Sequence, residues 1–181
     1  MSAFELFLSL FIAMFANTLP AFLLEMLKLP LPMRYPIDFH KKLLGHRILG
    51  DHKTFIGFLL MVCGALIAWH VLLAVLMLFD TVPAIFHSEV FAAPFLIAIG
   101  VFTGDAVGSF IKRRCGIMPG DNLPVIDNLD WIIGALLILN VLYGLPSLNA
   151  VVGLSIFFFA LHVAADRIAI NFHLRRKKPS S

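Results

Sequence analysis

Apolar and polar segments alternate along the chain in a way that predicts membrane-spanning helices. Long stretches of Leu, Ile, Val, Phe and Ala contain few polar residues and end at clusters of charge. A helix needs about 20 such residues to cross a bilayer. The stretch from Val90 to Phe102 is shorter, and by length alone it also fits a re-entrant segment. The expected spans are residues 3–27, 55–78, 90–111, 124–145 and 148–172, with polar loops at 28–54 and 112–123.

The positions of the basic residues indicate how often the chain crosses the membrane. Six of the 14 Lys and Arg residues lie between the first two spans, three follow the short stretch, and five lie near the C-terminus. The connections 79–89 and 144–147 contain none. Because cytoplasmic loops carry the excess of Lys and Arg, we expect both long loops and the C-terminus in the cytoplasm and the N-terminus outside. This alternation requires residues 90–111 to cross.

Composition supports a membrane protein and argues against other classes. Apolar residues make up 60% of the 181 residues, charged residues make up 14%, and the mean hydropathy is +0.94. A soluble domain is about half apolar and about a quarter charged. Two distant cysteines, Cys63 and Cys115, exclude a disulfide-rich secreted scaffold. We therefore expect an all-α integral membrane protein with five transmembrane helices, formed by one domain over residues 1–181.

The first long loop carries residues suited to binding phosphate. Glycines on both sides of Arg47 allow the backbone to approach a ligand closely. Arg47 offers a planar donor fork, and Lys53 offers a point charge. Lys53 and Thr54 open the second span, where free backbone N–H groups favour an anion. The alternative is a basic loop that only sets the topology. The candidate residues for binding or catalysis in this loop are Asp38, Arg47, Gly50, Asp51, Lys53 and Thr54.

A second charged cluster ends the third span and begins the fourth. Asp105, Ser109 and Lys112 are spaced to share one helix face, as are Asp127 and Asp130. Clustered carboxylates near a bilayer need a counter-ion, and Mg²⁺ commonly binds one or two carboxylates together with substrate phosphates. The alternative is that Asp127 caps a helix and that both later carboxylates complement its dipole. The candidate metal ligands are Asp105, Asp127 and Asp130, and further substrate-binding candidates are Ser109, Arg113, Pro119 and Gly120.

Isolated polar residues within the spans allow two interpretations. Asn17 lies in the inner half of the first span, where an Asn usually forms a hydrogen bond with a neighbouring helix. Its functional alternative is a contact with the polar site. His162 and Asp166 are four residues apart at the inner end of the last span. They fit a structural pair and a site role equally well.

Taken together, these motifs resemble the CDP-archaeol synthase family of membrane cytidylyltransferases, which is distantly similar to the CDP-diacylglycerol synthases. The resemblance covers most of the chain. One departure lies near the C-terminus, where the family has a His followed by Asn and Tyr and this chain has Asn171 followed by Phe172. The motifs that carry the resemblance are Asn17 with Pro20, Ile37-Asp38, Arg47 to Thr54 with Gly57, Gly104-Asp105, Ser109 to Arg114, and Pro119-Gly120 with Pro124, Asp127 and Asp130.

The resemblance implies a fold and a reaction. The implied fold is a five-helix membrane protein with a polar cavity facing the cytoplasm. The implied reaction uses Mg²⁺ to transfer the cytidylyl group of CTP to an archaeal-type ether lipid phosphate, which gives a CDP-lipid and pyrophosphate. The expected partners are CTP, the lipid phosphate and the bilayer, with no nucleic acid. The residues expected to carry catalysis are Lys53, Asp105, Lys112, Asp127 and Asp130.

Three other functions remain open at this point. A CDP-diacylglycerol-type synthase acting on phosphatidic acid would use the same phosphate chemistry. A transporter would place charged groups near the middle of the bilayer, often in repeated halves, and neither feature is present in the sequence. A non-catalytic membrane scaffold would bind neither CTP nor metal.

Overall fold

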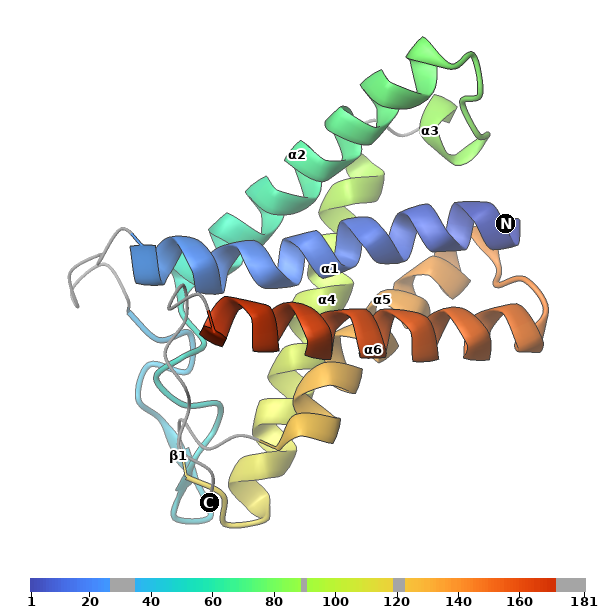
Figure 1. The fold of residues 1–181 in the computed structure, drawn as a ribbon. Helices are drawn as coiled ribbons and strands as arrows, with labels where there is room; N and C mark the ends of the chain where they lie inside the picture. The colour runs from blue at the N-terminus through green and yellow to red at the C-terminus, as the bar shows by residue number, and fades with distance from the viewer. Residues whose placement is uncertain (27–34, 89–90, 119–122, 172–181) are drawn as a thin grey trace.

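A computed structural model describes residues 1–26, 35–88, 91–118 and 123–171 (Figure 1). Five of its helices are long and apolar enough to cross a membrane, which confirms the expected number of spans. The predicted turn at Pro119 and Gly120 lies outside the described residues. The elements are α1 (Ala3–Met26), β1 (Lys42–Leu43), β2 (His46–Arg47), α2 (Phe55–Leu78), α3 (Ile85–Ser88), α4 (Ala92–Arg114), α5 (Pro124–Tyr143) and α6 (Leu148–Asn171).

The third spanning helix, α4, continues beyond its expected end. We expected this span to finish at residue 111, whereas the helix ends at Arg114. The three extra residues are all basic, and cations in the last turn of a helix interact favourably with its dipole. The extension keeps the side chain of Lys112 on a regular helix, in register with Asp105 two turns earlier.

Helix α1 forms the centre of the bundle. It lies beside α6, and the two helices run in the same direction (Figure 1). The ring of Phe7 on α1 contacts that of Phe158 on α6, with centroids 5.4 Å apart. At the opposite end from the charged loops, the short helix α3 packs into the bundle through a ring contact of 4.3 Å between Phe86 and Trp69. The apolar interior is thus closed at that end.

The backbones of α4 and α5 lie in unusually close contact. A methyl group built on Gly100 would lie 2.7 Å from the carbonyl oxygen of Gly134, and one on Gly104 would lie 3.0 Å from the Cα atom of Gly134. Small residues at intervals of four allow membrane helices to approach in this way. The contact places Asp130 of α5 directly against α4, because Gly108 also has no side chain to keep the two apart.

The first long loop is folded back onto the start of α2. Pro36 forms an isolated antiparallel bridge with Thr54, and the N–H of Ile37 donates to the carbonyl oxygen of Lys53 at 2.8 Å. The Thr54 hydroxyl accepts the N–H of Gly57 at 3.1 Å and so caps α2. Between these segments, β1 and β2 form a two-stranded antiparallel hairpin. These contacts hold the loop against the start of α2.

Candidate functional site

Two lysine–aspartate ion pairs connect the start of α2, the second half of α4 and the first turn of α5. Lys53, immediately before α2, pairs with Asp105 of α4. Further along α4, in its last turn, Lys112 pairs with Asp127 in the first turn of α5. These four residues come from the two clusters that the sequence singled out, and the fold brings the clusters together. The side chains are 10–24% exposed, so solvent screens these charges less than it would on an open surface.

Asp127 also has a structural role. Its Oδ2 atom accepts the backbone N–H of Leu123 at 3.1 Å, at the start of α5. This contact supports the helix-capping alternative for Asp127 considered from the sequence. The same carboxylate therefore holds the first turn of α5 and neutralises Lys112.

Asp130 differs from the other carboxylates because it is buried with one oxygen unsatisfied. The residue is 8% exposed, and its Oδ1 atom accepts the backbone N–H of Trp131 at 2.7 Å. Its Oδ2 atom is buried and has no hydrogen-bond partner among the described residues. The charges of Asp105, Lys53 and Asp127 lie within electrostatic range of it. A buried carboxylate without a partner is costly, so this oxygen is a candidate ligand for a cation.

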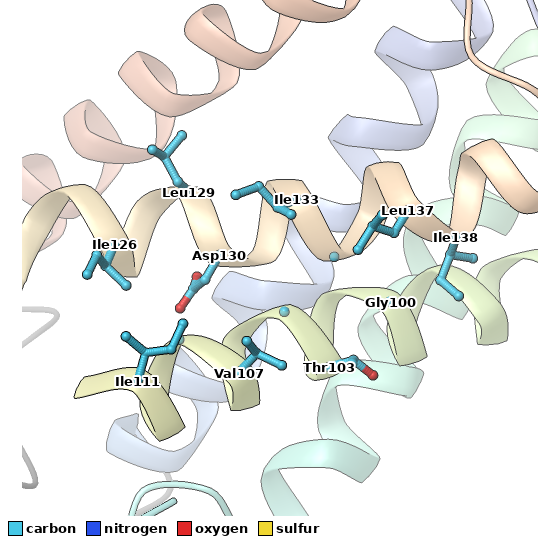
Figure 2. Close-up of a pocket in the computed structure, with 13 residues that line it drawn as sticks. Gly100, Thr103, Val107, Ile111, Ile126, Leu129, Asp130, Ile133, Leu137 and Ile138 are labelled. Atoms are coloured by element: carbon cyan, nitrogen blue, oxygen red, sulfur yellow. The ribbon is translucent and has the colours of Figure 1, made fainter. Parts of the chain in front are cut away.

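An apolar groove of about 490 Å³ runs between α4 and α5 beside this carboxylate (Figure 2). Among the described residues that line it, Asp130 alone is ionisable, and it points from α5 towards α4. The walls are branched aliphatic side chains, several of which are about half exposed on the outside of the bundle. They include Val107, Ile111, Ile126, Leu129, Ile133, Leu137 and Ile138. The charged cluster and an apolar surface therefore adjoin one another.

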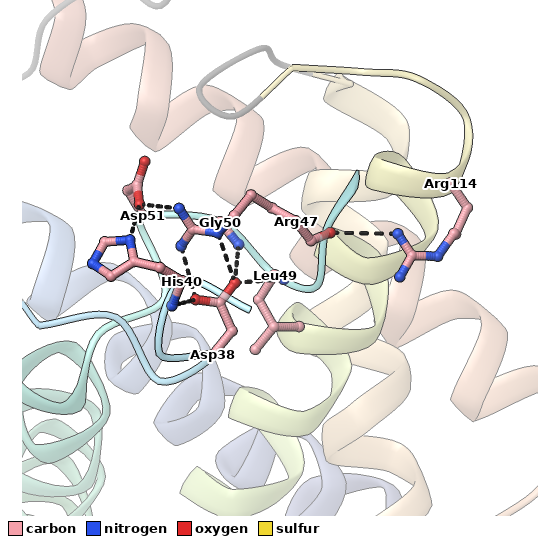
Figure 3. A network of polar contacts seen from close by, with 7 residues as sticks. All are labelled: Asp38, His40, Arg47, Leu49, Gly50, Asp51 and Arg114. Atoms are coloured by element: carbon pink, nitrogen blue, oxygen red, sulfur yellow. Dashed lines mark hydrogen bonds and ion pairs between the residues drawn. The ribbon is translucent and has the colours of Figure 1, made fainter. Parts of the chain in front are cut away.

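The first loop is organised around the carboxylate of Asp38 (Figure 3). Its Oδ1 atom accepts Nη2 of Arg47 at 2.8 Å, and its Oδ2 atom accepts Nε of Arg47 at 3.2 Å. Oδ2 also accepts the backbone N–H groups of Leu49 and Gly50 at 3.0 and 3.1 Å. Arg47 in turn donates from Nη1 to Asp51 at 2.7 Å. The side chain of Asp38 is only 1% exposed, so this network is the buried centre of the loop.

These contacts determine the charge states of the pair. Burial works to raise the pKa of Asp38, but hydrogen bonds from Arg47, Gly50 and Leu49 outweigh burial and lower its pKa from 3.8 to about 2. The hydrogen bond to Asp38 is the largest cause of the raised pKa of Arg47. Both groups are charged at neutral pH and interact with each other. Arg47 is further tied to α4, because its carbonyl oxygen accepts Nη1 of Arg114 at 3.4 Å.

The remaining predicted residues lie on α1, α4 and α6. Ser109 is buried on α4, one turn after Asp105. Arg113 is also buried, and its guanidinium donates to the carbonyl oxygen of Ile117. Asn17 is half-buried on α1. His162 is buried on α6 and its ring contacts that of Trp131, with centroids 5.5 Å apart.

No ready-made metal centre is present in the described part of the chain. Within residues 1–26, 35–88, 91–118 and 123–171, no three His, Cys, Asp or Glu side chains are grouped closely enough to hold a metal ion. Asp105 and Asp127 contact lysines instead. A site for Mg²⁺ would therefore have to include oxygen atoms from a substrate, which is the usual arrangement for this ion.

The glycines between α4 and α5 are the site residues that sequence reasoning did not single out as a group. Gly100, Gly104 and Gly108 recur every four residues and place Asp130 against α4. The spacing was visible in the sequence and is typical of helix contacts in membranes. It does not identify the facing helix, because the same pattern would serve a contact with any neighbour.

Comparison with known proteins agrees with the motifs. A family model described as CarS-like, CDP-archaeol synthase, matches residues 7–178. The chain belongs to the CDP-archaeol synthase family. This confirms the resemblance inferred from the two charged clusters, and the match extends over all five spanning helices.

Individual members of the CDP-archaeol synthase family are similar over most of their length. The enzyme from Methanopyrus kandleri is 38% identical over 143 residues, which cover 77% of this chain and 77% of the relative. That from Methanococcus maripaludis is 31% identical over 176 residues, 95% of this chain and 98% of the relative. A solved structure described as an intramembrane enzyme for archaeal membrane lipids biosynthesis has a TM-score of 0.72 and 31% identity, and the match covers 91% of this chain and 94% of that one.

Proposed function

We propose that the charged cluster at the ends of α2, α4 and α5 is the active site for the reaction of this family. As a family member, the chain is a CTP-dependent nucleotidyltransferase that transfers the cytidylyl group of CTP to an archaeal lipid phosphate. The products are a CDP-lipid and pyrophosphate. The residues that we assign to catalysis are Lys53, Asp105, Lys112, Asp127 and Asp130.

The observation that carries this proposal is the position of Asp130. Its unsatisfied carboxylate oxygen lies at the boundary between the lysine–aspartate pairs and the apolar groove. A lipid phosphate has the same two parts, an anionic head and an apolar chain. The groove suits the chain, and the lysines suit the head. A soluble nucleotide can reach the charged cluster from the aqueous side while the lipid remains in the bilayer.

The lysines supply the positive charge that the reaction needs. The lipid phosphate attacks the α-phosphorus of CTP in line, and pyrophosphate leaves. A phosphate monoester is already an anionic nucleophile, so positioning and charge neutralisation matter more than a strong general base. Lys53 and Lys112 are held near the site by Asp105 and Asp127, and we assign them to the substrate phosphates. Lys112 and Arg113 are both buried in this region.

The carboxylates fit a role in holding Mg²⁺. We assign this role to Asp130 first, because its buried Oδ2 atom has no hydrogen-bond partner in the described part of the chain. Asp105 and Asp127 would serve as further ligands, and their lysines would then be available to bind the substrate phosphates. When bound, Mg²⁺ would offset the negative charge of the triphosphate and of the departing pyrophosphate.

We assign the first loop to substrate binding, because its fold positions Lys53. Gly50, Asp51 and Thr54 lie close to Lys53 in the sequence. Asp38 and Arg47 are connected to this segment by the hydrogen bonds of Asp38 with Gly50 and of Arg47 with Asp51. Because Asp38 and Arg47 bind each other, we assign them to positioning Lys53. Asn17, Ser109 and the turn at Pro119 and Gly120 remain candidates for contacts with either substrate.

We place the active site on the cytoplasmic side of the cell membrane. The two loops that carry the site contain nine of the 14 Lys and Arg residues, and five more lie near the C-terminus. Such an excess is typical of cytoplasmic segments. The N-terminus is then outside, and the site faces the compartment that contains CTP.

Replacement of Asp130 by Asn tests the active-site proposal. Asn keeps the size of the side chain and an oxygen for the N–H of Trp131, but it removes the charge. We expect turnover to fall by about 100-fold or more, since charge stabilisation of this kind is worth that much in other enzymes. The melting temperature should change little, and raised Mg²⁺ should restore part of the activity. The assay uses labelled CTP and purified protein, with an archaeal ether lipid phosphate and phosphatidic acid offered separately.

Asp80→Asn provides the matched control. Asp80 is exposed in the connection between α2 and α3, at the end of the bundle away from the ion pairs, so its variant should retain full activity. An Asp130→Asn enzyme with nearly normal, Mg²⁺-dependent turnover would refute the assignment of Asp130. Equal use of phosphatidic acid and the ether lipid phosphate would show that the enzyme does not select between the two lipid types.

A further inference from the structure

The first loop carries a cluster of exposed aromatic rings that the reaction does not use. Tyr35, Phe39 and Phe55 stack edge to face, with centroids 5.9 Å apart for Tyr35 and Phe39 and 5.6 Å apart for Phe39 and Phe55. The three residues are 49%, 54% and 47% exposed. Half-exposed aromatic rings grouped in this way need a partner outside the described part of the chain.

This aromatic cluster is continuous with the outer surface of a spanning helix. Phe55 is the first residue of α2, and Leu59, on the same face one turn later, is 55% exposed. Helix α2 is one of the helices long enough to cross the membrane, so its exposed apolar side chains face lipid. The cluster therefore lies where α2 leaves the hydrocarbon, and Phe39 extends that surface onto the loop.

The backbone adopts an unfavourable conformation where it presents Phe39. Phe39 and the following His40 have φ angles of 51° and 59°, a left-handed region that is unfavourable for side chains other than glycine. Both are held in place by local hydrogen bonds: the N–H of Phe39 donates to Pro36 at 3.1 Å, and that of His40 donates to Asp38 at 3.1 Å. The strained turn directs a large apolar ring outwards, which folding alone does not require.

Two lysines next to the aromatic cluster give the surface a positive charge. Lys41 and Lys42 follow His40 directly, and both are exposed. Their ammonium groups form no ion pair within the described residues. Aromatic rings prefer the headgroup level of a bilayer, and lysines beside a membrane are attracted to anionic lipids.

We propose that Tyr35, Phe39 and Phe55, with Lys41 and Lys42, form an interfacial anchor that holds the first loop in the headgroup layer of a bilayer containing anionic lipids. The anchor and Lys53 are connected by the hydrogen bond between Ile37 and the Lys53 carbonyl. If the active-site proposal also holds, the anchor sets the depth of Lys53 at the level of the lipid phosphate. The anchor itself does not depend on that proposal.

Spin labelling in proteoliposomes tests the depth of the anchor. The full chain carries one spin-labelled cysteine, Phe39→Cys. The background carries Cys63→Ala and Cys115→Ser. Power saturation compares access by oxygen, which concentrates in lipid, with access by a water-soluble nickel chelate. The lipid reference is Val71→Cys, at an exposed position within α2, and the loop reference is His46→Cys on the exposed hairpin.

We expect the label at position 39 to be reached by oxygen and protected from nickel, with a depth between those of the two references. Nickel access equal to that at position 46 would refute the anchor. A label that neither reagent reaches would also refute it, since a protein partner would then cover the cluster. Activity is not the readout, so a failure here leaves the catalytic assignment intact, and loss of that assignment leaves this result standing.

The contribution of the lysines is tested separately with Lys41→Gln and Lys42→Gln combined. In vesicles containing an anionic phospholipid, the label at position 39 should become more accessible to nickel than in the parent protein. In vesicles of zwitterionic lipid alone, the two proteins should have the same accessibility. An unchanged depth in anionic vesicles would refute the role of the lysines, and the label at position 39 would still report on the rings.

Discussion

The contact between α4 and α5 makes Gly104→Ala a sharp test of how the site is positioned. A methyl group at residue 104 would overlap the carbonyl oxygen of Asp130. It would also lie 2.9 Å from the carbonyl carbon of Asp130 and 3.0 Å from the Cα atom of Gly134, whereas ordinary contacts begin at 3.4 Å. The obstacles are backbone atoms, which cannot move aside like a side-chain end. The two helices must therefore part by about 1 Å or more to restore normal contact distances.

This displacement should affect activity more than stability. Overpacking a helix contact costs about 1–3 kcal/mol, which a bundle of this size can tolerate while remaining folded. Asp130 would move relative to Asp105, and misplacement of a catalytic group by about 1 Å can cost 100-fold in rate. We expect kcat/KM for CTP to fall by about 10-fold or more, with a lower melting temperature.

The assay compares kcat/KM and thermal unfolding in the same membrane preparation for Gly104→Ala and Gly153→Ala. A methyl group on Gly153 of α6 would meet no atom within 4 Å, so that variant should keep its activity and gain up to about 1 kcal/mol from the better helix propensity of Ala. A Gly104→Ala enzyme with wild-type kcat/KM would refute the conclusion that the backbone contact positions Asp130.

Two further predictions concern the first loop. Lys53→Ala should weaken CTP binding by about 10- to 150-fold, because a hydrogen bond to a charged group contributes about 1.5–3 kcal/mol; calorimetry measures this, and unchanged affinity would assign Lys53 to topology alone. The pKa of Asp38 is about 2 in the folded protein against an ordinary 3.8, so its ionised form stabilises the loop above about pH 4, and this stabilisation is lost as the pH falls towards 2. This acid transition of the loop can be measured by hydrogen exchange. It should be absent in Asp38→Asn, and its persistence there would contradict the assigned pKa.

The spanning helices were the most predictable part of the molecule. Residues 55–78 were expected as a span and coincide with α2, because an apolar run interrupted only by His70 and flanked by Lys53 and Asp80 leaves little choice of boundary. The basic residues after residue 111 were expected to begin a loop, and they continue α4 instead. Hydropathy detects where a helix leaves the membrane, but it does not detect where the helix ends.

The sequence indicated which charged residues belong to the site better than it indicated which of them pair with one another. Sequence spacing placed Asp105 and Lys112 on one face of a helix. The fold pairs Asp105 with Lys53 of the first cluster and Lys112 with Asp127 of the next helix. Arg47 was expected to meet phosphate and is bound to Asp38, nine residues away. Such pairings depend on how the loop between α1 and α2 folds and on which helices touch, and neither property is encoded by local periodicity.

The floor of the groove between α4 and α5 is formed by backbone atoms in direct contact, and this determines how a lipid chain can enter and leave the groove. A lipid chain lying there cannot pass between the helices, so it enters and leaves sideways from the surrounding leaflet. Its methylene groups exchange lipid neighbours for Ile133 and Leu137 without meeting water. The penalty of about 0.8 kcal/mol for each CH₂ exposed to water is therefore avoided. Substrate and product can diffuse in two dimensions to the next membrane protein.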